Sequence, residues 1–148
     1  MMSRRNFLAV AAALGAGALL GGCAGGEDAM ADERTISVTC GDAVVTYERN
    51  DSPASDALLA QLPLALEVED FSDNEKVFYP PEELDVTDAP LAETGAAGTL
   101  AYYAPWGDVV MFYGSFSPNG ALYELGRAVD GVDAIARLSG EIEIVLTR

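Results

Sequence analysis

The first residue with a recognisable chemistry is Cys23, which follows an apolar stretch near the N-terminus. With residues 20–22 it reads LGGC, and small residues of this kind let a peptidase cut before a cysteine that becomes lipidated. Lipid chains on Cys23 would anchor the mature protein to a membrane surface. The sequence therefore predicts a lipoprotein signal peptide over 1–22 and lipidation at Cys23. A flexible tether over 23–34, made mainly of small and acidic residues, precedes a folded domain over 35–148.

The residues before this cysteine form an export signal. Arg4 and Arg5 give it a charged start, and the apolar run over 7–20 is shorter than the ~20 residues of a membrane-spanning helix. Residues 3–8 (SRRNFL) resemble the twin-arginine export motif, although Ala9 stands where that motif usually has lysine. An ordinary secretory signal and an uncleaved membrane helix are the alternatives. We expect a lipid-anchored protein at the extracytoplasmic face of the cell membrane.

Aromatic side chains are the second group with recognisable chemistry, because they fill cores and also stack against peptides or flat small molecules. Half of the chain's aromatic residues lie within 102–116. Strand alternation sends Tyr102 and Tyr103 to opposite faces, so part of this cluster must be core. The other part lines a ligand groove or is ordinary packing, and the sequence leaves both open. At a predicted strand corner, Trp106 is the candidate for exposure, and Tyr102, Tyr103 and Tyr79 are candidate ligand contacts beside it.

Other common catalytic and metal-binding sets are missing from the sequence. It contains no histidine, the commonest general base and metal ligand. The acidic residues of 70–75 and 82–85 lack the spacing of a calcium loop, so we expect a solvated surface, with neither metal nor cofactor. Without a basic neighbour, Cys40 is expected to be a small buried hydrophobe. The formal net charge of −16 argues against nucleic acid as a partner.

The elements that must position these residues are short strands. Alternating or turn-bounded patterns predict strands over 35–40, 43–48, 64–69, 75–79, 99–103, 108–113, 121–129 and 141–146. A short helix is expected to begin at Ser52 and Pro53, and a second one to follow Gly131. Short strands at even spacing indicate an all-β barrel or sandwich with the helices over its open ends. The long loop 85–98 is a candidate rim or lid beside Trp106.

Several short stretches of the folded domain are similar to the bacterial cyclophilin-like proteins. They are residues 52–55, 62–64, 75–80 and above all 102–108. The resemblance covers about 35–148 and implies a closed eight-stranded barrel capped by two short helices. A more distant likeness to true cyclophilins, the peptidyl-prolyl isomerases, covers 120–135 and places Leu122 where those enzymes have a pocket histidine. Their arginine-phenylalanine-glutamine strand has no counterpart, so the resemblance carries the fold and not the catalytic residues.

These features predict a membrane-anchored extracytoplasmic binding module for a peptide or small ligand. The alternative is an atypical extracytoplasmic peptidyl-prolyl isomerase, which fold analogy alone supports. Such an enzyme stabilises a twisted amide largely through a guanidinium, and the sequence places none at the expected position. A structural subunit that holds a partner lipoprotein is a third reading.

Overall fold

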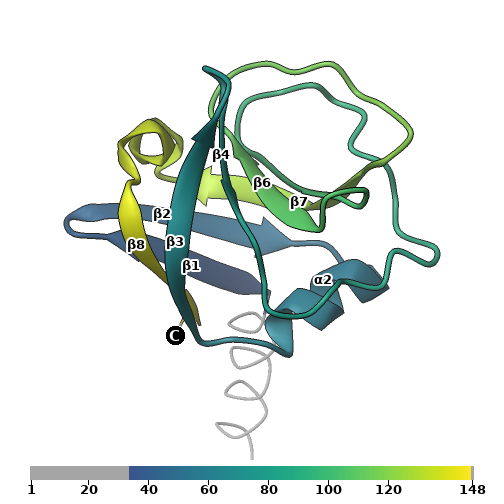
Figure 1. The fold of residues 1–148 in the computed structure, drawn as a ribbon, viewed down its shortest axis with the longest axis horizontal. Coiled ribbons are helices and arrows are strands. Elements are labelled where there is room, and N and C mark those ends of the chain that lie inside the picture. Colours follow the sequence, from purple (N-terminus) through teal and green to yellow (C-terminus); the bar gives the residue numbers. More distant parts are fainter. Residues whose placement is uncertain (1–33, 148) are drawn as a thin grey trace, which may run out of the picture. The chain divides into compact units, whose positions relative to one another are not determined.

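The computed structural model describes residues 34–147, which form a barrel of eight strands and two short helices (Figure 1). The signal peptide over 1–22, nearly all of the tether, and with them Arg4, Arg5 and Cys23 lie outside the described residues. The strands are β1 (Thr35–Cys40), β2 (Ala43–Arg49), β3 (Leu64–Phe71), β4 (Glu75–Phe78), β5 (Thr99–Tyr103), β6 (Asp108–Phe112), β7 (Leu122–Asp130) and β8 (Gly140–Leu146). The predicted strands are confirmed, although β3 runs further than expected and ends at Phe71.

The strands close in the order β1-β2-β7-β5-β6-β4-β3-β8, and every neighbouring pair is antiparallel. Closure is made by β1, which pairs with β2 on one side and with β8 on the other. Full closure leaves no open sheet edge for another chain to extend. The expected closed eight-stranded barrel is therefore confirmed.

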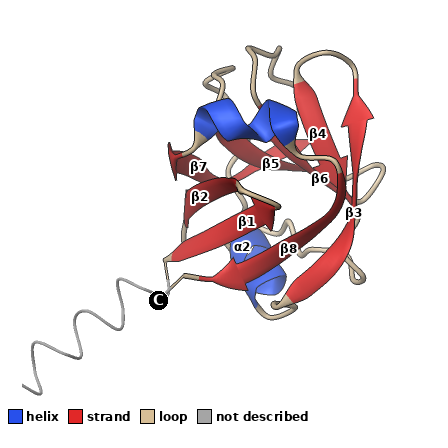
Figure 2. Ribbon diagram, turned by 90° about the vertical axis from the view of Figure 1, so that its left-hand side faces the viewer, coloured by secondary structure: helices blue, strands red, loops and turns tan. Residues whose placement is uncertain are grey.

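Two helices lie at opposite ends of the barrel (Figure 2). The first, α2 (Pro53–Leu59), begins as predicted, because the Ser52 hydroxyl accepts a hydrogen bond of 3.2 Å from the Ser55 N–H. The second, η3 (Val132–Arg137), is a 3-10 helix that follows Gly131 in a left-handed conformation. Both helices bury apolar side chains in the core. No helix in the described part of the chain is long and apolar enough to cross a membrane.

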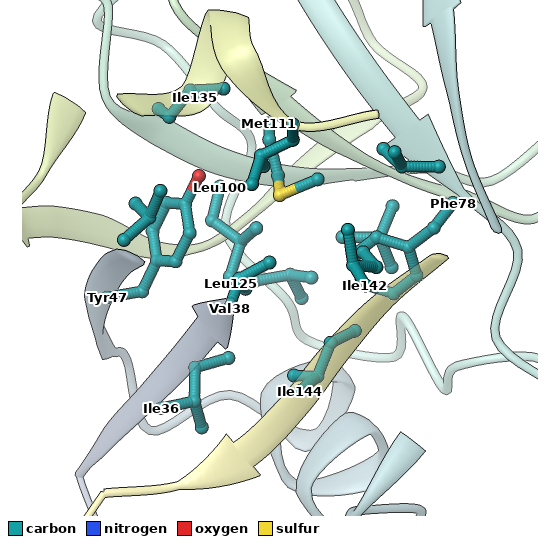
Figure 3. Packing of buried hydrophobic residues seen from close by; sticks show 14 of the residues in the cluster. Ile36, Val38, Tyr47, Phe78, Leu100, Met111, Leu125, Ile135, Ile142 and Ile144 are labelled. Carbon is teal, nitrogen blue, oxygen red and sulfur yellow. The ribbon is translucent and has the colours of Figure 1, made fainter. Parts of the chain in front are cut away.

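Inward-facing side chains of all eight strands fill the barrel (Figure 3). The labelled core residues in that view are Ile36, Val38, Tyr47, Phe78, Leu100, Met111, Leu125, Ile135, Ile142 and Ile144. Among the remaining core residues is Tyr102, only 2% exposed, whose hydroxyl accepts a hydrogen bond of 3.2 Å from the Leu84 N–H. Cys40 is half-buried at the edge of this core, and its thiol donates to the Ser139 carbonyl at 3.0 Å.

A second apolar layer covers the outer face of β4, β6, β5 and β7. It consists of Val77, Ala92, Ala101, Val110, Phe112 and Leu122, with Tyr103 and Phe116 packed against it. The loop 85–98 supplies part of its cover and is fixed along β7: the Ala92 N–H donates to Leu122 O at 2.9 Å, and Pro90 O accepts from the Glu124 N–H at 2.8 Å. This half of the barrel carries a buried apolar cluster on its outside, and the candidate site lies there.

Candidate functional site

An open cavity of about 380 Å³ lies on the outer face of the barrel, and we call it the Trp106 pocket. Its lining comes from the end of β3, from β4, β5 and β6, from the turn after β5, and from the segment 114–120 with the start of β7. The lining residues are Phe71, Ser72, Asn74, Glu75, Tyr103, Trp106, Asp108, Val110, Phe112, Phe116, Ser117, Asn119 and Leu122. Five of these side chains are aromatic, and no lysine or arginine is among them.

The exposed wall of the pocket is Trp106, at the corner between β5 and β6. The N–H groups of Trp106 and Gly107 both donate to Tyr103 O, at 3.2 and 2.9 Å, and Gly107 takes the positive φ of 71° that this turn requires. The indole packs edge-on against Tyr103 and Phe71, with ring centroids 5.4 and 5.2 Å apart. The Trp106 side chain remains 52% exposed, which confirms the expectation drawn from its place at the corner.

Another aromatic part of the lining is Phe116, which stacks on Phe112 with centroids 3.8 Å apart and planes 13° from parallel. Its backbone N–H donates to Gly95 O at 3.1 Å, and the Asn74 side chain donates to Ser115 O at 2.9 Å. A Cβ atom at Gly95 would lie 2.7 Å from Phe116 O, closer than real Cβ contacts come, so glycine permits this approach. The segment 114–120 is thus held against both the turn between β3 and β4 and the loop 85–98.

Two carboxyl groups, Asp108 and Glu75, line the pocket. Asp108 begins β6 directly opposite Tyr103 of β5, is 2% exposed, and its Oδ1 has no hydrogen-bond partner. Burial raises the pKa of Asp108, and the charge of Glu69 adds to this, while the Asp108 backbone N–H opposes it. Burial, with the nearby charge of Asp108, raises the pKa of Glu75 to about 7. Both groups therefore resist ionisation in the pocket.

The structure brings together only part of the predicted site. Tyr103 and Trp106 meet in the pocket, whereas Tyr102 points into the barrel core, as alternation requires. Tyr79 follows β4 and is 47% exposed, but its side chain does not line the pocket. Burial and the charges of Asp108 and Glu69 raise the pKa of Tyr79. None of the loop 85–98 lines the pocket either, and the segment 114–120 stands in the place expected for it.

Of the predicted contacts, only Tyr103 and Trp106 line the pocket, and the residues that sequence reasoning missed include Phe71, Glu75 and Asp108. Phe71 lies beyond the end of the predicted strand 64–69, in a stretch that is otherwise polar. The acids carried a signal, because each occupies an outward position of a strand whose next outward residue is a buried valine, Val77 after Glu75 and Val110 after Asp108. An acid that continues an apolar stripe is unusual, since burial disfavours its charged form.

The pocket holds neither a metal site nor a recognised catalytic set. No cluster of three or more metal-binding side chains occurs within residues 34–147. The lining residues include neither cysteine nor histidine. The arrangement offers flat apolar contact and two carboxyl groups, of which Asp108 is buried and Glu75 is partly buried.

Comparisons with known proteins agree with this fold. A model of the cyclophilin-like family matches residues 38–147, most of the chain. A model of the twin-arginine translocation pathway signal sequence matches residues 1–21, which confirms the predicted export motif around Arg4 and Arg5. No curated protein matches the chain.

Proposed function

The chain belongs to the cyclophilin-like family and carries a twin-arginine export signal, and from these facts we propose that it is a lipid-anchored extracytoplasmic binding module. It holds a peptide or small ligand in the Trp106 pocket without chemically changing it. One observation carries this proposal: an open, aromatic-walled cavity whose exposed tryptophan is fixed in place by its neighbours. A volume near 380 Å³ lies within the range of ligand sites, roughly 300–1,000 Å³.

The pocket chemistry favours binding over isomerisation of a prolyl bond. Leu122, at the position of the pocket histidine in true cyclophilins, is a buried apolar residue of the pocket lining. No guanidinium lines the cavity to polarise a twisted amide. These features support a binding role.

The membrane anchor is supported by the order of motifs in the sequence. The matched signal over 1–21 ends just before Cys23, where the lipobox places its cysteine. Export followed by lipidation at Cys23 would leave the barrel on a short tether outside the cytoplasmic membrane. A pocket on the outer face of the barrel is then open to ligands from that compartment.

The binding role can be tested by nuclear magnetic resonance on the full chain in uncharged detergent. Trp106 is the only tryptophan in the protein, so its indole N–H signal reports on the pocket without assignment of the remaining spectrum. The probes are small aromatic fragments in neutral, cationic and anionic groups. We expect at least one group to shift this signal in a saturable way.

Matched variants locate the binding. Val110→Phe places a ring on the floor of the pocket and should abolish the shifts. Val129→Phe makes the same change at a valine that is 58% exposed on β7 and lies outside the pocket, and it should leave the shifts unchanged. If no fragment of any charge moves the Trp106 signal, or if Val110→Phe binds as well as the unmodified protein, the binding role is wrong.

A further inference from the structure

We propose that the Trp106 pocket selects an organic cation that carries N–H donors, a guanidinium or primary ammonium group such as an arginine or lysine side chain presents. This inference rests on the proposed binding function and names the class of ligand. Three independent features of the pocket support it: a buried carboxylate oxygen without a partner, a second acid nearby without a basic counterpart, and an exposed aromatic wall.

The first feature is the carboxylate of Asp108. Along β6, Asp108, Val110 and Phe112 alternate to the same outer face, and all three line the cavity. Only 2% of Asp108 is exposed, and Oδ1 accepts no hydrogen bond. Buried polar atoms in folded proteins nearly always have partners, and the exceptions concentrate where function needs them. A ligand N–H that reached this oxygen would remove the deficit.

The second feature is the absence of a compensating charge. Glu75 lines the same cavity and interacts electrostatically with Asp108, which in turn interacts with Glu69. The nearest basic residue in sequence, Lys76, is turned to the other side of β4 and pairs with Asp70 at 2.5 Å. Buried acids are ordinarily paired with cations, and within residues 34–147 no basic side chain forms an ion pair with the buried Asp108. A cationic ligand would form one.

The third feature is the aromatic wall. Trp106 is half exposed, and Tyr103 and Phe71 hold its ring by perpendicular contacts. Organic cations bind favourably to the faces of such rings, tryptophan best of all. A hydrated metal ion would gain little from these walls. A quaternary ammonium would use the rings but would leave Asp108 Oδ1 without a donor. The combination of rings and an unpaired oxygen therefore favours a cation that also donates N–H groups.

The charge of the whole protein acts in the same direction. A formal net charge of −16 surrounds the pocket with a negative field, which raises the local concentration of cations and speeds their arrival. Anionic ligands meet the opposite effect. Because this field is screened by salt, cation binding should weaken as ionic strength rises.

The test compares two ligands that have nearly the same shape and differ in charge. Nα-acetyl-arginine amide and its uncharged counterpart Nα-acetyl-citrulline amide are titrated against the full chain in uncharged detergent, with Trp106 fluorescence as the signal. We expect the arginine compound to bind at least tenfold more tightly at low salt, and to lose this advantage in 1 M salt. Agmatine and an acetylated tripeptide with a central arginine are then compared. Tighter binding of agmatine indicates a free small-molecule cation, and tighter binding of the tripeptide indicates an arginine side chain within a peptide.

Two variants link the preference for the cation to the acids, and a third is the control. Asp108→Asn and Glu75→Gln should each lower the affinity for the arginine compound about tenfold and leave that for the citrulline compound nearly unchanged. The control Glu143→Gln removes the same charge from an exposed position of β8, outside the pocket, and should leave both affinities unchanged. Because Asp108→Asn changes a buried group, the comparison of ligands on the unmodified protein decides the matter if that variant fails to fold.

The outcomes separate this inference from the proposed function. Equal binding of the arginine and citrulline compounds, or tighter binding of citrulline, overturns cation selectivity and leaves the binding function standing. Failure of both compounds overturns the selectivity as well. The binding function itself falls if the neutral, cationic and anionic fragments also leave the Trp106 signal unmoved, or if Val110→Phe binds them as well as the unmodified protein.

Discussion

The acidic lining of the Trp106 pocket should make the protein less stable as the pH rises from 5 to 8, and Glu75→Gln should remove much of that loss. The pKa of Glu75 is raised from its ordinary value near 4.5 to about 7 in the folded chain. The folded state therefore binds this proton more tightly than the unfolded state does. The resulting stabilisation is complete below about pH 4.5 and disappears as the pH rises through about 7.

The size of the effect follows from the same two values. Full conversion at ~1.4 kcal/mol per pKa unit would give roughly 3 kcal/mol. Glu75 is only partly buried, and water screens such a group, so we expect about 1–2 kcal/mol of unfolding free energy. The groups that act on it are Asp108 on β6, whose pKa is also raised, and, through Asp108, Glu69 on β3. Tyr79, whose pKa is raised as well, stays neutral over this range.

Urea unfolding at pH 5 and pH 8, followed by Trp106 fluorescence, measures this difference. The chain is strongly acidic, so general repulsion also grows with pH, and the control Glu143→Gln removes one exposed charge far from the pocket. We expect the unmodified protein and Glu143→Gln to lose similar stability between the two pH values, and Glu75→Gln to lose clearly less. If Glu75→Gln keeps the full pH dependence, the burial of Glu75 does not raise its pKa in the way argued.

Three further predictions concern the site and the anchor. Trp106→Ala should cost about 1–2 kcal/mol of unfolding free energy, measured by circular dichroism, because half of the residue is exposed. Tyr102→Ala should cost about 3–5 kcal/mol, because it truncates a core side chain. Equal losses would place Trp106 in the core. Cys23→Ser should leave an uncut precursor, and an unmodified Cys23 in mature protein, seen by mass spectrometry, would contradict lipidation. A protease-coupled peptide assay should show prolyl isomerisation on the order of a hundredfold or more below that of a true cyclophilin, and cyclophilin-like rates would contradict the reading of Leu122.

Local patterns in the sequence predicted most of the fold because they record which face of an element is buried. Alternation placed Tyr102 and Tyr103 on opposite faces, and the structure confirms this, with Tyr102 inside the barrel and Tyr103 outside it. The capping side chain of Ser52 marked the start of α2 for an equally local reason. Gly107, next to Trp106, marked the corner that exposes the indole.

The composition of the pocket depends on which strands become neighbours, and local patterns do not encode that order. Phe71 contacts Trp106 because β3 pairs with β4, and β4 pairs with β6. The strands β4 and β6 are far apart in sequence. The same pairings bring Glu75 within electrostatic reach of Asp108. The loop 85–98 looked like a free rim, but backbone hydrogen bonds fix it along β7. Each of these features results from tertiary pairing.

The position of the site on the outside of the barrel follows from how a closed barrel is stabilised. Its interior is filled by side chains from all eight strands, so the space for a ligand lies outside. The outer layer over β4, β6 and β5 would be more stable if Asp108 and Glu75 were apolar, because each acid resists ionisation there. A ligand that supplies N–H donors and positive charge would lower both pKa values and return that stability on binding. The stability that these acids cost the folded protein and the affinity for such a ligand therefore have the same physical origin.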